Sequence, residues 1–94
     1  MATAYVKHQV KDFDSWKNSY DELANVRKEN GVIGASVHRD VNDPNSVVVM
    51  HRFADMGTAK AFLNSSDLKS AMERSGVVGH PEIWLCNDVE VTSH

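Results

Sequence analysis

Two short stretches of this sequence place a histidine in the same setting. Val6–Asp12 and Val49–Asp55 each read apolar, any residue, His, any residue, apolar, any residue, Asp. The two histidines, His8 and His51, are 43 residues apart (51 minus 8), which is close to half of the 94-residue chain. We interpret this spacing as one β-α-β unit used twice. Such a duplication would set the matching strands side by side and parallel, with both imidazoles on one face of the sheet.

A third histidine joins them through a predicted hairpin. Asp43–Ser46 reads as a turn, because proline presets φ and the Asp and Asn side chains form local hydrogen bonds. If Pro44 and Asn45 are the central pair, the hairpin register places His38 directly opposite His51. Three imidazoles would then cross the sheet in a row, on strands about 4.8 Å apart.

Three interpretations of this row remain open. Neutral imidazole binds zinc, copper and iron, so His8, His38 and His51 could form a metal site with an open position. Without a metal, a buried histidine with a lowered pKa exchanges protons near neutral pH; His51 would then be the proton acceptor, with His8 and His38 as its partners. Alternatively, all three are structural and satisfied by hydrogen bonds. Periodicity does not determine which face of the sheet they occupy.

The elements that would position these residues follow from periodicity and from helix-capping residues. Alternation predicts strands, and spacings of three and four predict helices; Phe13, Trp16, Tyr20, Leu23 and Arg27 form one helical stripe. Asp12 or Asp14 caps the first helix, and Asp55 caps the second. The expected strands are 5–10, 33–41, 46–54 and 82–91, the expected helices are 12–29, 56–64 and 68–74, and Gly79-His80-Pro81 is expected to be a loop.

This order predicts a single α+β domain over residues 1–94. Short connections and right-handed crossovers give a ferredoxin-like β-α-β-β-α-β fold, a four-stranded antiparallel sheet with both helices on one face and the first and third strands central. The other face of the sheet would be too apolar for water. We therefore expect a homodimer in which a partner's sheet covers it.

Composition excludes several classes of function. The net charge of −3, without a basic stripe, disfavours nucleic-acid binding. Cys86 is the only cysteine, which excludes an intrachain disulfide and fits a reducing compartment. We see no signal peptide and no run approaching the ~20 apolar residues of a membrane span, so we expect no membrane partner and a cytoplasmic location.

The chain resembles the dimeric α/β-barrel superfamily, which includes the antibiotic biosynthesis monooxygenases and the heme-degrading monooxygenases. Three features carry the resemblance: the third strand leading into Phe53-Ala54-Asp55 with Ala59 in the helix, the run 63–72, and the opening 10–17. The resemblance implies that two sheets pair across a homodimer, and that each monomer keeps a cavity between its sheet and its helices.

The resemblance also implies roles for individual residues. Phe53 stands where the monooxygenases carry a cavity tryptophan, so Phe53, with His51 and Val49 in phase, would line the cavity, and His8 would face it too. Met72 stands where the heme-degrading enzymes carry their iron-ligating histidine, which makes heme unlikely. Val49 and Phe53 replace the asparagine and tryptophan of the cofactor-free enzymes, so a different way of activating the substrate is required.

Three functional hypotheses follow. The first is a small enzyme without a cofactor that oxygenates, cyclises or isomerises a hydrophobic aromatic or polyketide-like compound; His51 accepts the proton, and Val49, Phe53 and Met72 form the apolar wall. Trp84 could stack on the ligand and His80 could lie at the cavity entrance. The second is a non-catalytic dimeric module that binds a ligand or a protein. The third is a transition-metal enzyme that uses the three histidines.

Overall fold

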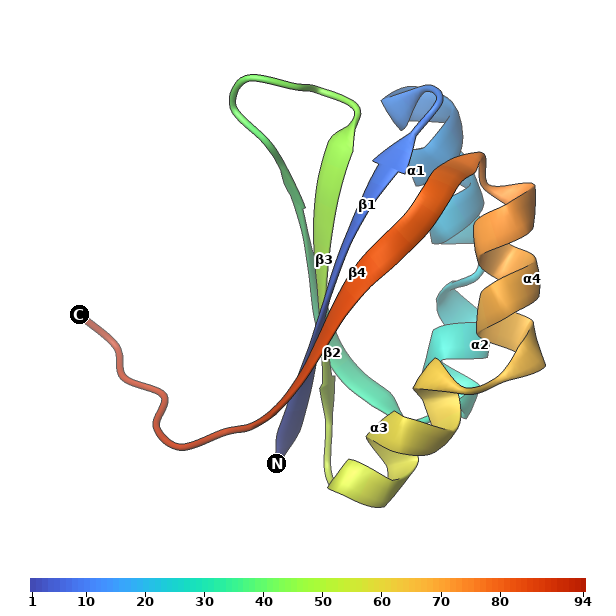
Figure 1. The fold of residues 1–94 in the computed structure, drawn as a ribbon. Coiled ribbons are helices and arrows are strands. Elements are labelled where there is room, and N and C mark those ends of the chain that lie inside the picture. Colours follow the sequence, from blue (N-terminus) through green and yellow to red (C-terminus); the bar gives the residue numbers. More distant parts are fainter.

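The computed structural model describes residues 1–94 as one four-stranded antiparallel sheet with all helices on one of its faces (Figure 1). The strand order β2-β3-β1-β4 confirms the predicted ferredoxin-like topology, with the first and third strands central. The elements are β1 Ala2–Val10, α1 Phe13–Glu22, α2 Ala24–Glu29, β2 Val32–Arg39, β3 Ser46–Phe53, α3 Met56–Leu63, α4 Ser66–Arg74 and β4 Val77–Asn87.

The two histidine-bearing strands, β1 and β3, lie side by side but antiparallel, so the predicted parallel arrangement is wrong. The cause is the short hairpin between β2 and β3, which reverses the chain before β3 begins. His8 stands opposite Val47, and His51 stands opposite Ala4. Because directly opposed residues share a face, both histidines point to the helix side, four positions apart along the strands.

The first predicted helix is two helices. Asp12 accepts a hydrogen bond from the backbone N–H of Ser15 at 3.0 Å and caps α1, which ends one residue before Leu23. Leu23 leaves the helical conformation with φ −95° and ψ 14°, and its N–H donates to the carbonyl oxygen of Tyr20 in a tighter turn. The break separates α2 from α1, yet Trp16, Tyr20, Leu23 and Arg27 of the predicted stripe still face one cavity.

The second half of the chain follows the same capping chemistry. Asp55 accepts from the N–H of Thr58 at 2.7 Å and starts α3, while Ser65 accepts from the N–H of Leu68 at 3.2 Å and starts α4. None of the helices is long and apolar enough to cross a membrane.

The last strand differs from its prediction at both ends. β4 begins at Val77 rather than Glu82, and it ends at Asn87 rather than Val91. Its pairing with β1 shifts between Lys7 and Gln9, so that 79–81, predicted as a loop, form a bulge inside the strand opposite His8. Gly79 permits this bulge because its φ is +72°.

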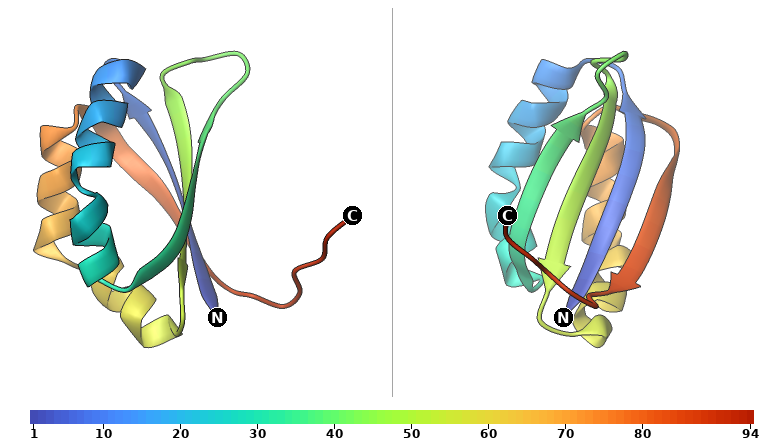
Figure 2. Two further views of the ribbon diagram at one scale, coloured as in Figure 1. Left: turned by 180° about the vertical axis from the view of Figure 1, so that it is seen from behind. Right: turned by 90° about the vertical axis from the view of Figure 1, so that its left-hand side faces the viewer.

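The sheet has one covered face and one bare face. Phe53, Phe62 and the small residues Ala2, Ala4 and Ala59 form a buried cluster beneath α3, while Val10, Trp16, Val47 and Val49 form a second cluster beneath α1. Figure 2 (right) shows the bare face, with the four strands in front and the helices behind. Trp84, Tyr5 and Met50 stand next to one another on it, in register across three strands.

Candidate functional site: a histidine-lined cavity

A cavity of about 60 Å³ lies between the sheet and the helices. Its wall is mostly apolar and is built from every layer of the fold: Val6, His8, Trp16, Tyr20, Leu23, Val26, Arg27, Val49, His51, Phe62, Asp67, Leu68, Ala71, Met72 and Ser75. This volume holds a few water molecules, whereas ligand sites typically measure about 300 Å³ or more. A sizeable aromatic ligand therefore requires the helices to move apart from the sheet.

His51 is buried in the cavity wall with only 5% of its surface exposed. Its Nε2 lies 3.3 Å from the hydroxyl of Tyr20, and its Nδ1 has no hydrogen-bond partner. Burial lowers the pKa of His51 to about 4, helped by the nearby charge of Arg27 and then by His8. The imidazole is therefore neutral at pH 7, with a lone pair on one of its ring nitrogens.

His8 is 7% exposed, and neither of its ring nitrogens has a partner. Its ring meets the Trp16 indole edge to face, with the centroids 5.4 Å apart. Burial lowers the pKa of His8, so this imidazole also favours its neutral form. Buried polar groups are almost always hydrogen-bonded in proteins, so unpartnered nitrogens on two histidines in one cavity point to a ligand or to water.

The aromatic side chains of α1 connect the two histidines. Tyr20 stacks on Trp16 with the centroids 5.0 Å apart, and its ring lies parallel to His51 within 10°. On the other side, the rings of His51 and Phe62 of α3 meet edge to face, with their centroids 5.6 Å apart. Such pairs hold rings in fixed orientations, so this wall is preorganised.

Arg27 is the positively charged side chain in the cavity wall. Its guanidinium lies 3.6 Å from the centre of the Tyr20 ring, and its Nη1 donates to the Tyr20 carbonyl oxygen at 2.6 Å. No carboxylate forms an ion pair with it. Burial raises the pKa of Tyr20, while the charge of Arg27 acts in the opposite direction and that of Asp21 adds to the rise.

Tyr20 and Arg27 line the cavity, whereas the sequence analysis assigned them only to a helix stripe. The signal that could have found them is the stripe itself, because it ends in an arginine among otherwise apolar or aromatic residues. The sequence did not reveal the hydrogen bond from Tyr20 to His51, which joins residues 31 positions apart.

The prediction that His38 lies opposite His51 is wrong. Ala35 is the residue opposite His51, and His38 pairs with Val48 on the bare face, where its Nε2 lies 2.8 Å from the Ser36 hydroxyl. The register differs by three residues (38 minus 35), and an odd shift turns a side chain to the other face. The predicted row of three histidines is therefore not formed.

The cause lies in the β2–β3 loop, which is wider than the tight turn predicted at Pro44. The Asp40 carboxylate accepts hydrogen bonds from the N–H groups of Asn42 and Asp43, and the Asp40 N–H donates to the carbonyl oxygen of Ser46. The loop therefore starts near Asp40, several residues before the turn predicted at Pro44. No group of three or more His, Cys, Asp and Glu side chains is placed to hold a metal ion.

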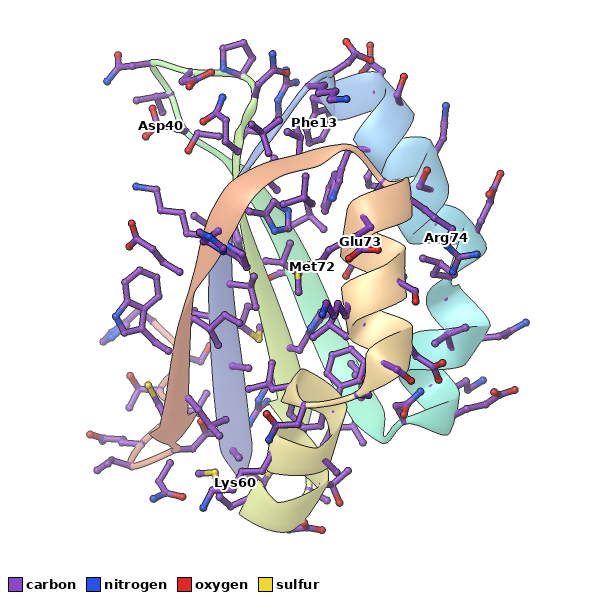
Figure 3. The ribbon with its side chains drawn as sticks, turned by 45° about the vertical axis from the view of Figure 1, so that its right-hand side comes forward. Phe13, Asp40, Lys60, Met72, Glu73 and Arg74 are labelled. Atoms are coloured by element: carbon purple, nitrogen blue, oxygen red, sulfur yellow. The ribbon has the colours of Figure 1, made fainter.

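The other predicted ligand contacts divide between the cavity and the rest of the molecule. Val49 and Met72 lie in the cavity wall, and Figure 3 shows Met72 on the side of α4 that faces the sheet, with Arg74 on the other side. Phe53 is fully buried against Phe62 in the core and does not line the cavity.

Trp84 and His80 also lie outside the cavity. Trp84 is 49% exposed on the bare face, because its position in β4 has the opposite phase to the cavity residues. His80 lies in the β4 bulge and lines a separate surface groove between α4 and β4. The bulge, which the sequence does not signal, removes His80 from the cavity entrance.

Comparison with known proteins gives a consistent family. Residues 1–74 match the antibiotic biosynthesis monooxygenase family. No curated protein matches the chain.

Solved structures extend the likeness to almost the whole chain. SnoaB from Streptomyces nogalater, a cofactor-independent oxygenase, has a TM-score of 0.79 and 13% identity, covering 99% of this chain and 97% of its own. An antibiotic biosynthesis monooxygenase has a TM-score of 0.73 and 14% identity, covering 96% and 100%. A protein of unknown function from Nitrosomonas europaea has a TM-score of 0.76 and 14% identity, covering 99% and 93%. At these identities the likeness establishes the fold.

Proposed function

Because the match spans most of the chain, the protein belongs to the antibiotic biosynthesis monooxygenase family, and from this premise we propose that it oxygenates a hydrophobic aromatic or polyketide-like compound in the histidine-lined cavity. The observation that carries the proposal is the pair of buried, neutral imidazoles, His8 and His51, with unpartnered nitrogens in an apolar wall. A structural pair of histidines would have its hydrogen bonds satisfied within the protein.

His51 is the proton acceptor in this proposal. The substrate loses a proton to the imidazole and becomes an electron-rich anion, which supplies the electrons that dioxygen requires. One oxygen atom of dioxygen enters the substrate as a carbonyl oxygen. The other oxygen atom leaves as water together with the two hydrogens that the substrate carbon loses, so the reaction balances. His8 holds a polar group of the substrate, while Val49 and Met72 contact its apolar part. SnoaB, a cofactor-independent oxygenase of the same fold, supports a reaction without a bound cofactor.

The test is oxygen uptake with a panel of polycyclic phenols and enolisable aromatic ketones. We expect purified protein to consume dioxygen with at least one of them, and His51→Gln to slow that rate about 100-fold or more, the usual contribution of a general base. His38→Gln is the matched control, because His38 lies on the other face of the sheet. Unchanged uptake in His51→Gln would remove His51 from the mechanism. Binding of the panel without any uptake would instead favour a non-catalytic binding module.

We also propose that the protein is a homodimer joined through the bare face of the sheet. Trp84, Tyr5 and Met50 present a continuous apolar row there, and water would cover it in a monomer. A second copy of the same face is its natural complement, since a two-fold interface repeats one patch on both subunits.

A further inference from the structure

We propose that Tyr20 is a second catalytic residue, whose hydroxyl contacts the ligand and relays the ligand's proton to His51. The inference rests on the proposed function, because it assigns the first step of that reaction. Tyr20 lines the cavity beside His51, and its hydroxyl is the only hydrogen-bond partner of the imidazole.

The direction of the hydrogen bond follows from acidity. A phenol is a much stronger acid than a neutral imidazole, so the Tyr20 hydroxyl donates to Nε2 of His51 and the ring carries its own hydrogen on Nδ1. The lone pairs of the hydroxyl oxygen are then free to accept a proton from a ligand. The separation of 3.3 Å is long for such a bond, and catalytic hydrogen bonds commonly shorten when a ligand is bound.

The relay is a concerted exchange of two protons. The ligand's O–H or C–H bond breaks and its proton passes to the Tyr20 oxygen, while the Tyr20 hydroxyl proton passes to Nε2 of His51. The products are a ligand anion, an unchanged neutral Tyr20 and an imidazolium at His51. The proton returns along the same route to the oxygen atom that leaves as water, so the protein ends in its starting state.

The surroundings suit both members of the pair. Burial keeps the Tyr20 phenol neutral, so that it can both donate and accept, and burial keeps His51 unprotonated before the reaction. Arg27 lies against the Tyr20 ring without a carboxylate partner, and its charge stabilises an anion formed there. The other titratable groups in the wall are His8, which is neutral, and Asp67, which is exposed at the start of α4.

The first test determines which nitrogen of His51 carries the hydrogen, by ¹⁵N NMR at pH 7. The chain has two tyrosines, and the other one, Tyr5, lies on the bare face, so Tyr5→Phe is a matched control for Tyr20→Phe. We expect the hydrogen on Nδ1 in the wild type and in Tyr5→Phe, and a shift to Nε2 in Tyr20→Phe. Hydrogen on Nε2 in the wild type, or no change in Tyr20→Phe, would overturn the assigned direction.

The second test follows proton transfer without oxygen chemistry, with 4-nitrophenol as the probe, because its anion is coloured. We expect the bound probe to ionise about one pH unit lower in the wild type and Tyr5→Phe than in Tyr20→Phe, because a hydrogen bond from the Tyr20 hydroxyl to the phenolate favours the charged form. Equal ionisation in Tyr20→Phe and the wild type, or no saturable binding at all, would overturn the relay.

The two proposals fail in different ways. Ionisation that depends on Tyr20, without oxygen uptake for any substrate, would leave the relay standing and remove the oxygenase. Oxygen uptake that is unchanged in Tyr20→Phe would leave the oxygenase standing and remove the relay. In a relay the loss appears in kcat, about 100-fold, with KM changed little, because the hydroxyl acts in the transition state.

Discussion

At the scale of single residues, the molecule keeps two histidines neutral inside an apolar wall. His51 has one hydrogen bond, to Tyr20, and His8 has none. Leaving such groups without partners costs free energy, typically about 1–3 kcal/mol each. A ligand that hydrogen-bonds to them would recover this energy, so the two imidazoles favour a ligand with polar groups.

This arrangement predicts a loss of stability in mild acid. The pKa of His51 falls from 6.5 to about 4 on folding, so between these pH values the unfolded chain binds a proton that the folded protein does not. The contribution of His51 to stability is therefore complete above pH 6.5 and is lost as the pH falls towards 4. We expect the free energy of unfolding, measured with urea, to fall by about 2 kcal/mol from pH 7 to pH 5 through His51 alone.

His51→Leu should remove that part of the pH dependence. His94→Gln, at the exposed end of the chain, should retain all of it. The burial of His8 acts in the same direction, so some loss should remain in His51→Leu. An identical slope in the wild type and His51→Leu would contradict the placement of a neutral imidazole in the interior.

At the scale of elements, the cavity depends on how the helices pass over the sheet. The break at Leu23 turns α2, and the chain then re-enters the sheet through Gly31, whose φ is +90°. A Cβ atom at Gly31 would stand 2.3 Å from Cγ2 of Thr58, in the first turn of α3. This glycine therefore permits both the reversal and the close approach of the α2–β2 connection to α3.

Gly31→Ala should destabilise the protein by about 2 kcal/mol, because it combines a strained backbone with a steric clash. Gly34→Ala is the control, since a Cβ there meets no atom within 4 Å. We expect a change of less than about 0.5 kcal/mol for that variant. Urea unfolding measures both, and equal stability of the two variants would show that the contact between Gly31 and Thr58 is looser than described.

At the scale of the whole molecule, the helices cover one face of the sheet and the other face is bare (Figure 2). The cavity lies on the covered face. The dimeric barrel expected from the sequence would place two bare faces together and leave each cavity within its own subunit. The cytoplasmic location remains a prediction that the structure does not test.

The dimer has a direct test. Sedimentation equilibrium should give twice the mass of the chain for the wild type and the monomer mass for Trp84→Glu, because the substitution buries a charge in an apolar interface. Val41→Glu is the control, since Val41 is 96% exposed in the β2–β3 loop and lies outside the paired strands. A monomeric wild type, or a dimeric Trp84→Glu variant, would exclude this interface.

The sequence alone indicated the succession of strands and helices and the order of the strands in the sheet, but not the break at Leu23 or the start of β4 at Val77. Alternation in β1, helical spacing from Phe13 to Arg27, and the capping carboxylates of Asp12 and Asp55 act over a few residues. Local chemistry of this kind is readable without coordinates, and it led to the fold. The repeated pattern also predicted that His8 and His51 share one face, which the structure confirms even though their strands run antiparallel and not parallel.

Only the tertiary structure decided which side chains meet. The side-chain hydrogen bonds of Asp40 widened the hairpin and moved His38 to the bare face, and a bulge in β4 moved His80 out of the cavity. The contact between Tyr20 and His51 depends on how α1 packs on β3. Such packing is set by many weak contacts between distant segments, so the residue pattern of either segment does not specify it.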